Sequence, residues 1–176
     1  MPHPQISNTQ LQSDHEVVAK NKLHVGLAEN ELHIMQAVFL CELLHEESFF
    51  AHIPFSREKS KNMMVKTLEK PVSNGLLMAH YGEEPMECAL FCAGEYNAGV
   101  DTLITTVMGL YVNPRWRRNP VGAKAALRLI NGIKKWSDAR NVSHISIHTT
   151  AGIDTQKTDK LLRRLGFITL GGNYVG

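Results

Sequence analysis

The sequence lacks an apolar run long enough to cross a bilayer, and it has no segment that resembles a signal peptide. We therefore expect a soluble protein made for a cytoplasm. It also lacks a large excess of charge of either sign, because 19 Lys and Arg residues nearly balance 17 Asp and Glu residues and leave a net charge of +2. So small a charge does not indicate a general binder of polyanions.

Cysteine is scarce, with three residues in the chain. Cys41 falls in a helical pattern, whereas Cys88 and Cys92 lie on one predicted strand. Four residues along a strand separate them by about 13 Å, and a disulfide needs Cα atoms within about 7 Å. We therefore expect free thiols in a reducing compartment. His144 and His148 are also four apart on a predicted strand, so they cannot share one metal ion, and we expect no metal site.

The chain is long enough to bury a core, since 43% of its 176 residues are hydrophobic. Residues 1–21 are polar, contain two prolines and show little apolar periodicity. We expect them to form a loosely ordered N-terminal extension, with a partner-binding arm as the alternative interpretation. Residues 22–176 are expected to form one domain.

The first half of this domain mixes helical and strand patterns, which is typical of an α+β fold. A helix is predicted from Glu31 to about Leu44, and Ser56 is a good N-cap for a second helix that runs to about Lys70. The predicted buried face of the first helix is Ile34, Met35, Val38, Leu40 and Cys41. Strands are predicted at 23–28, 76–81 and 86–94, with the short polar loop 82–85 between the last two.

The stretch from Leu103 to Trp136 reads as strand, loop and helix. An apolar run over 103–112 ends at an Asn-Pro turn signal, and three arginines, Arg115, Arg117 and Arg118, precede a segment with helical spacing. Asn119 is a good N-cap and Pro120 suits the first helical position. The apolar face of the helix is Val121, Ala125, Leu129, Ile130, Ile133 and Trp136. A helix start offers unpaired N–H groups and a partial positive charge, so this junction predicts a diphosphate site.

This junction resembles a known family. Residues 112–123, Val-Asn-Pro-Arg-Trp-Arg-Arg-Asn-Pro-Val-Gly-Ala, fit the pattern V-x-P-x-x-[RQ]-x-x-G-x-[GA], except that Pro120 replaces the first glycine. The pattern is typical of the GNAT superfamily of acetyl-CoA-dependent N-acetyltransferases. Segments 150–154 and 161–167, with His45-Glu-Glu-Ser48 upstream, most resemble small members encoded by tailed phages. The likeness extends over about residues 22–176.

The resemblance implies a mixed α+β fold with a central, mostly antiparallel twisted sheet of about 6–7 strands, flanked by about four helices. A parallel, splayed pair should lie in the middle of the sheet, formed by the strands before and after the long helix. A strand at 144–149, a helix from about Thr155 to Arg164 and short strands around Phe167 and Tyr174 would complete it. The pantetheine arm of the coenzyme would enter the gap between the splayed strands.

The resemblance also assigns acetyl-CoA binding largely to main-chain groups. The predicted coenzyme-binding residues are Leu110, Tyr111, Val112, Arg117, Arg118, Asn119, Pro120, Val121, Gly122, Ala123 and Thr155. Pro120 has no N–H, so one donor that glycine offers is absent, although the first helical N–H is often unpaired.

The groups for proton transfer depart from the family's usual pattern. Leu162 stands where many members have a Tyr, Thr155 where an Asn is common and Thr106 where a Glu is common. The remaining catalytic candidates are His148, Tyr111 and Glu47, with His144 and His45 as further ones. A histidine titrates near neutrality and can take an ammonium proton directly or through water.

The sequence thus predicts acetyl transfer from acetyl-CoA to a primary amine by direct attack in a ternary complex, since no residue is an obvious nucleophile. The alternative is a catalytically degenerate GNAT-fold protein that binds a protein partner, which fits Pro120 and the absent Tyr, Asn and Glu. The acceptor, a small molecule or a protein, is not specified. A homodimer is expected from the resemblance alone. Trp116 among arginines also suggests a nucleic-acid contact, but the strand-to-helix junction favours a compact phosphate ligand.

Overall fold

The computed structural model describes residues 22–149 and 151–171, and contains five strands and four helices in these ranges. The strands are β1 (Leu23–Leu27), β2 (Asn74–Tyr81), β3 (Glu84–Glu95), β4 (Leu103–Val112) and β5 (His144–Ile147). The helices are α2 (Glu31–Glu47), α3 (Arg57–Glu69), α4 (Pro120–Asp138) and α5 (Thr155–Arg164). The extension predicted at 1–21 and the strand predicted around Tyr174 lie outside the described residues.

The strands form one sheet in the order β1-β2-β3-β4-β5. Pairing is antiparallel from β1 to β4, whereas β4 and β5 are parallel because α4 carries the chain back between them. The predicted α+β fold, with four helices and a mostly antiparallel sheet, is confirmed for the described residues. The predicted 6–7 strands are wrong there: the sheet has five, and its parallel pair lies at the edge instead of in the middle.

The absence of a strand around Phe167 has a local cause. Gly166 has a φ of 86°, and the Phe167 N–H donates to the Leu162 carbonyl (3.0 Å), which closes the end of α5. The Phe167 ring then lies 5.1 Å from the Lys134 ammonium of α4. Residues 165–171 are therefore held against α5 and α4 and form no strand.

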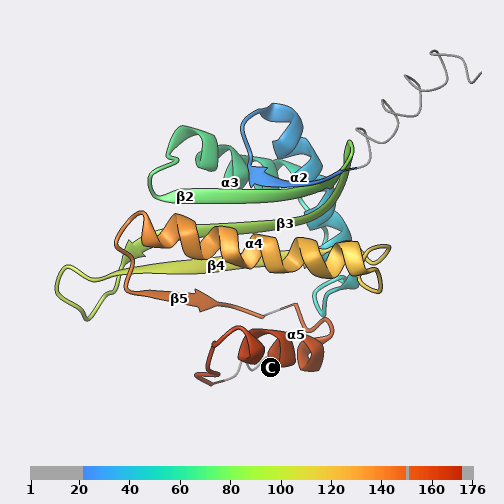
Figure 1. The fold of residues 1–176 in the computed structure, drawn as a ribbon. Helices are drawn as coiled ribbons and strands as arrows, with labels where there is room; N and C mark the ends of the chain where they lie inside the picture. Colours follow the sequence, from blue (N-terminus) through green and yellow to red (C-terminus); the bar gives the residue numbers. More distant parts are fainter. Residues whose placement is uncertain (1–21, 150, 172–176) are drawn as a thin grey trace, which may run out of the picture.

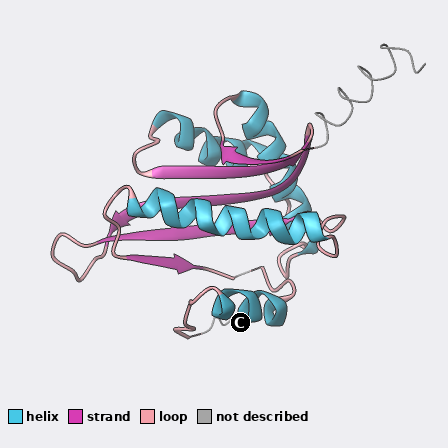
Figure 2. Ribbon diagram, viewed as in Figure 1, coloured by secondary structure: helices cyan, strands magenta, loops and turns pink. Residues whose placement is uncertain are grey.

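Helices cover both faces of the sheet, as Figures 1 and 2 show: α2 and α3 lie on one face, and α4 lies on the other. The α4-side core includes Phe91, Leu129 and Trp136. The opposite core includes Ile34 and Met64. The predicted apolar face of α4 is buried except for a half-buried Val121.

The predicted face of α2 is wrong at one position. Met35 is 44% exposed, and Ala37 lies in the core instead. Apolar residues lie on all sides of α2, so their spacing alone does not identify which side of the helix is buried. Neither α2 nor any other helix in the described ranges has the length and apolar character needed to span a membrane.

Candidate active site

A cavity of about 920 Å³ opens where β4 and β5 part. The last paired residues of the two strands are Val107 and Ile147, and the His148 N–H still donates to the Val107 carbonyl (3.3 Å). Beyond this point β4 continues to Val112 with only β3 beside it. The cavity is lined by the end of β4, the loop and first turns of α4, the loop after β5, and α5, together with Leu44 of α2.

The cavity passes through the sheet. Ala126 of α4 lines it from one face, whereas Leu44 and Tyr111 line it from the other, where they belong to the core under α2 and α3. A ligand that enters beside α4 can therefore present its far end on the α2 side. This is the splay that the family resemblance implies.

Main-chain groups at the end of β4 point into the gap. The Val107 carbonyl faces β5, since it accepts from the His148 N–H. The Val112 carbonyl also faces the open side, where it accepts from Arg117 Nε (2.8 Å). The N–H of the same peptide group, that of Asn113, points the opposite way and donates to the Met86 carbonyl of β3 (2.9 Å). Positions 107 and 112 would face opposite ways on a regular strand. The register skips Met108, and this irregularity reverses the alternation. The main-chain N–H and carbonyl groups of Leu110 and Val112 consequently face the cavity side, where the Val112 carbonyl is bonded to Arg117.

The start of α4 offers fewer free donors than the sequence suggests. Pro120 has no N–H, and Asn119 Oδ1 accepts from the Val121 N–H (2.8 Å) as an N-cap. The Asn119 N–H donates to the Trp116 carbonyl (3.1 Å). In residues 22–149, the main-chain N–H groups of Arg118 and Gly122 form no hydrogen bond. These two N–H groups remain available to an anion in the cavity that both residues line.

Gly122 is required here by a close approach. A Cβ at this position would lie 2.1 Å from the Trp116 carbonyl oxygen and 2.9 Å from its carbon. The loop before α4 therefore folds tightly onto the first turn of the helix. Trp116 itself is 7% exposed and its ring lies 5.3 Å from that of Tyr81, so it is a core residue and offers no free face for a nucleic-acid base.

Tyr111, Glu47 and Arg117, three predicted site residues, meet in one network. The Tyr111 hydroxyl donates to Glu47 Oε1 (2.5 Å), and Arg117 donates to both Glu47 oxygens (2.6 and 2.9 Å). The guanidinium also lies 5.2 Å from the Tyr111 ring centre. Arg117 thus joins the end of α2, the end of β4 and the loop before α4, and its charge is paired.

The network sets the protonation of its members. Burial alone would raise the pKa of Glu47, but the hydrogen bonds from Arg117 and Tyr111 outweigh it and hold that pKa below its usual value. Burial, with the hydrogen bond to Glu47, raises the pKa of Tyr111 well above its usual value. At neutral pH Glu47 is therefore ionised and Tyr111 is protonated.

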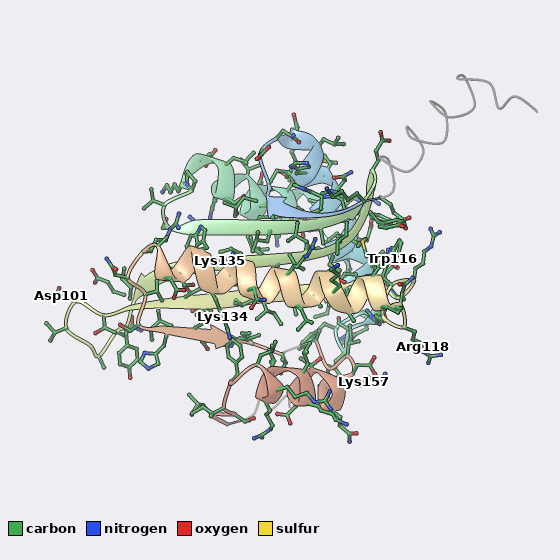
Figure 3. The ribbon with its side chains drawn as sticks, in the orientation of Figure 1. Asp101, Trp116, Arg118, Lys134, Lys135 and Lys157 are labelled. Carbon is green, nitrogen blue, oxygen red and sulfur yellow. The ribbon has the colours of Figure 1, made fainter. Side chains whose placement is uncertain are left out.

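Two cations flank the opening beside α4. Arg118 and Lys157 both line the cavity, and Figure 3 shows them at the end of the molecule where α4 begins, far from Asp101. Lys157 pairs with Asp154 (3.0 Å), whereas Arg118 forms no ion pair within the described ranges. A hydrogen bond from Lys157 lowers the pKa of Asp154, so that carboxylate is ionised and paired.

Most predicted site residues line this one cavity, and a few do not. Those that line it are Leu110, Tyr111, Val112, Arg117, Arg118, Gly122, Ala123 and His148. Asn119, Pro120 and Val121 form the start of α4 behind them, and Thr155 is an exposed residue at the start of α5. His45 Nε2 contacts the Ile53 carbonyl (2.6 Å) and holds the α2–α3 loop. His144 pairs with Ile104 at the far end of β5.

Sequence reasoning missed two charged groups. Lys157 lies in the first turn of α5, and its place after a glycine-containing loop was a usable signal. Glu87 is fully buried, and neither carboxylate oxygen has a hydrogen-bond partner in the described part of the chain. A lone acid within the apolar run of β3 was its signal. Burial raises the pKa of Glu87 to about 8, so it is mostly protonated at neutral pH.

No metal centre accompanies these groups in residues 22–149 and 151–171, where no three His, Cys, Asp or Glu residues lie close enough to hold an ion. The cysteines there are free thiols, and none of them lines the cavity.

No protein-family model matches this chain, and no curated protein matches it. Several solved structures do. The aminoglycoside N-acetyltransferase AAC(6')-Iy, in complex with a CoA-linked bisubstrate analogue, is 13% identical with a TM-score of 0.68, covering 88% of this chain and 97% of its own. An aminoglycoside 6'-N-acetyltransferase from Acinetobacter haemolyticus is 18% identical with a TM-score of 0.63, covering 87% and 96%. An acetyltransferase from Trypanosoma brucei is 13% identical with a TM-score of 0.64, covering 88% and 98%. At these identities the likeness establishes the fold, and this chain has the fold of GNAT acetyltransferases.

Proposed function

We propose that this chain is an acetyl-CoA-dependent N-acetyltransferase that moves an acetyl group to a primary amine by direct attack in a ternary complex. The observation that carries this function is the cavity through the sheet, which joins the cationic start of α4 to the opposite face. Its similarity to solved acetyltransferases, one of them bound to a CoA analogue, supports the same conclusion. Residues 22–176 form the catalytic domain in this proposal.

The coenzyme's phosphates lie at the start of α4. The free N–H groups of Arg118 and Gly122 bind pyrophosphate, and the side chains of Arg118 and Lys157 supply positive charge. Gly122 allows the loop to fold tightly, while Asn119, Pro120, Val121 and Ala123 shape the first turn. The paired guanidinium of Arg117 acts on the shape of the site and adds no net charge.

The thioester lies along the open end of β4. The N–H groups of Leu110 and Val112 and the Leu110 carbonyl face the cavity, so they hold the pantetheine arm, and the N–H groups polarise the acetyl carbonyl. The amine approaches from the α2 side, attacks the carbonyl carbon and displaces the CoA thiolate. None of the cysteines in the described ranges lines the cavity, which favours direct attack over an acetylated cysteine.

Proton transfer is assigned to His148. Its side chain is exposed on the cavity wall, and an imidazole takes a proton from an ammonium group directly or through water. Tyr111 stays protonated and Glu47 stays paired, so in this scheme both position the wall of the acceptor side. Leu162 lines the cavity where many family members have a Tyr, so the departing thiolate receives its proton from solvent.

The second candidate is a degenerate member of the fold that binds a protein partner. One observation favours it: Asn119 occupies the Val121 N–H and Pro120 offers none, so two donors of the usual phosphate site are lost. A phage origin, a cytoplasmic location, a homodimer and a role for residues 1–21 all stay predictions from the sequence.

Titration calorimetry with acetyl-CoA separates the two candidates. We expect micromolar binding, with desulfo-CoA and adenosine bisphosphate as controls that divide the pantetheine contribution from the phosphate contribution. Arg118→Glu should weaken binding at least tenfold, whereas Lys135→Glu, an exposed charge farther along α4, should not. No heat of binding up to millimolar acetyl-CoA would refute the enzyme and favour the partner-binding protein.

A further inference from the structure

The two ends of the cavity differ in charge and polarity. Arg118 and Lys157 make the α4 end cationic, whereas Leu44 and the Tyr111 ring line the α2 end, where the charge of Arg117 is paired with Glu47. Ile153, in the loop after β5, adds a further apolar side chain to the cavity wall. From this difference, and resting on the proposed function, we propose that the acceptor is a small primary monoamine with an apolar body. A polyamine or a polypeptide amine is the alternative that the site disfavours.

No carboxylate in the cavity wall is free to bind a second ammonium group. Asp154 is the only acidic residue in the described part of the wall, and it is paired with Lys157. Glu47 does not line the cavity, and it accepts three hydrogen bonds, from Tyr111 and Arg117. A second positive charge would therefore lose water without gaining a partner.

Exposed apolar and aromatic side chains lie in the loop between α2 and α3, which contacts the cavity wall where the Phe49 N–H donates to the Ala151 carbonyl. Phe49 is 65% exposed and Ile53 is 49% exposed, both in the loop between α2 and α3. The Phe49 ring stands edge-on to the Phe50 ring at 5.4 Å. Apolar residues this exposed become buried when an apolar body covers them, and burial of that area favours binding.

The same loop restricts the size of the acceptor. Its Phe49 N–H donates to the Ala151 carbonyl (3.1 Å), which bridges the α2–α3 loop to the loop after β5. His45 bonds the Ile53 carbonyl and fixes the other side of the loop. This hydrogen bond ties the two loops together beside the cavity, which leaves less room for a polypeptide acceptor than for a small amine.

A matched pair of amines tests the charge argument. Benzylamine and 1,4-bis(aminomethyl)benzene share one apolar body and differ by one aminomethyl group. We expect kcat/KM for acetyl transfer from acetyl-CoA to be at least tenfold higher for benzylamine. Ile153→Glu, which adds a carboxylate to the wall, should reduce this ratio to about threefold or less, whereas the neutral Ile153→Gln should keep it. A phenylalanyl pentapeptide amide tests the size argument.

The outcomes distinguish this inference from the proposed function. Equal use of the two amines, a preference for the diamine, or faster acetylation of the peptide would overturn the inference and leave the acetyltransferase intact. Binding of acetyl-CoA without acetylation of either aromatic amine would also overturn it. Absence of acetyl-CoA binding by calorimetry would overturn the proposed function, and this inference with it.

Discussion

The α4 end and the α2 end of the cavity are built in different ways. The α4 end is made mostly by neighbouring residues, Arg118 to Ala123, with main-chain groups at the start of one helix, and Lys157 of α5 adds a charge to it. The α2 end assembles residues far apart in the chain, since Glu47 lies 64 positions from Tyr111 and 70 from Arg117. The first end therefore depends on local backbone geometry. The second depends on side-chain pairing across the fold.

The largest effect is expected where the backbone has no room. Gly122→Ala places a methyl group 2.1 Å from the Trp116 carbonyl oxygen, so the loop must move away from the first turn of α4. Because that backbone is the proposed phosphate site, we expect acetyl-CoA affinity to fall at least a hundredfold. Gly132→Ala in the same helix meets only the flexible Leu77 side chain at 2.9 Å and should change affinity less than threefold. Equal calorimetric affinities for the two variants would contradict a backbone-defined α4 end.

The second effect is expected on the free energy of unfolding, through the buried Glu87. Glu87 pairs with Val112 across the β3–β4 ladder and is buried with its pKa raised to about 8 from an ordinary value of 4.5. Between those values the folded protein holds a proton that the unfolded chain has released. The free energy of unfolding should therefore fall as pH rises, by about 1.4 kcal/mol per pH unit, and level off above about pH 8.

Urea unfolding from pH 5 to pH 9 measures this slope. Glu87→Gln stays neutral, so it should flatten the profile over that window. Glu95→Gln, an exposed acid at the end of the same strand, should leave it unchanged. A wild-type profile that rises with pH between 5 and 8 would show that Glu87 is ionised in the folded protein.

The α4 end, which depends on local backbone geometry, was the more predictable of the two. The N-cap Asn119, Pro120 and the apolar spacing placed the start of α4 correctly, because all three act within one or two turns. The donor lost when Asn119 caps Val121 was not foreseen, since an N-cap pattern does not say which N–H groups a ligand would find free. The strand predicted around Phe167 failed for a similar reason, because a helix cap at Gly166 competed with strand pairing.

The α2 end, which depends on pairing between distant residues, was only partly predictable. The resemblance named Tyr111, Glu47 and Arg117 as separate candidates, but no sequence pattern indicated that they pair with one another. The face of α2 was also ambiguous, since Leu32, Met35 and Phe39 are apolar and exposed. Which apolar residues enter a core depends on the opposing sheet, and that information is not local to the helix.

The third effect tests the pairing at the α2 end. Glu47→Gln removes the negative charge to which Arg117 and Tyr111 donate. One of the two accepting oxygens becomes an NH₂ group, which cannot accept a hydrogen bond from either residue. We expect a loss of about 2 kcal/mol in the free energy of unfolding, with a larger fall in kcat than in acetyl-CoA affinity. Glu46→Gln, the exposed neighbour, is the control and should stay within about 0.5 kcal/mol of wild type. If the two variants match in urea unfolding and in kcat, the network has no role in holding the wall.

The smallest effect separates helix stability from ligand binding at the α4 end. Asn119→Ala removes the cap on Val121 and should cost about 1 kcal/mol of folding stability. The same change frees the Val121 N–H for a phosphate, so acetyl-CoA affinity should rise two- to threefold while stability falls. Asn30→Ala is the matched control, since Asn30 caps α2 through the His33 N–H (3.0 Å) on the other side of the sheet. That variant should lose similar stability with no gain in affinity. If Asn119→Ala weakens acetyl-CoA binding, the Asn119 side chain itself contacts the coenzyme, and the α4 end is not defined by backbone donors alone.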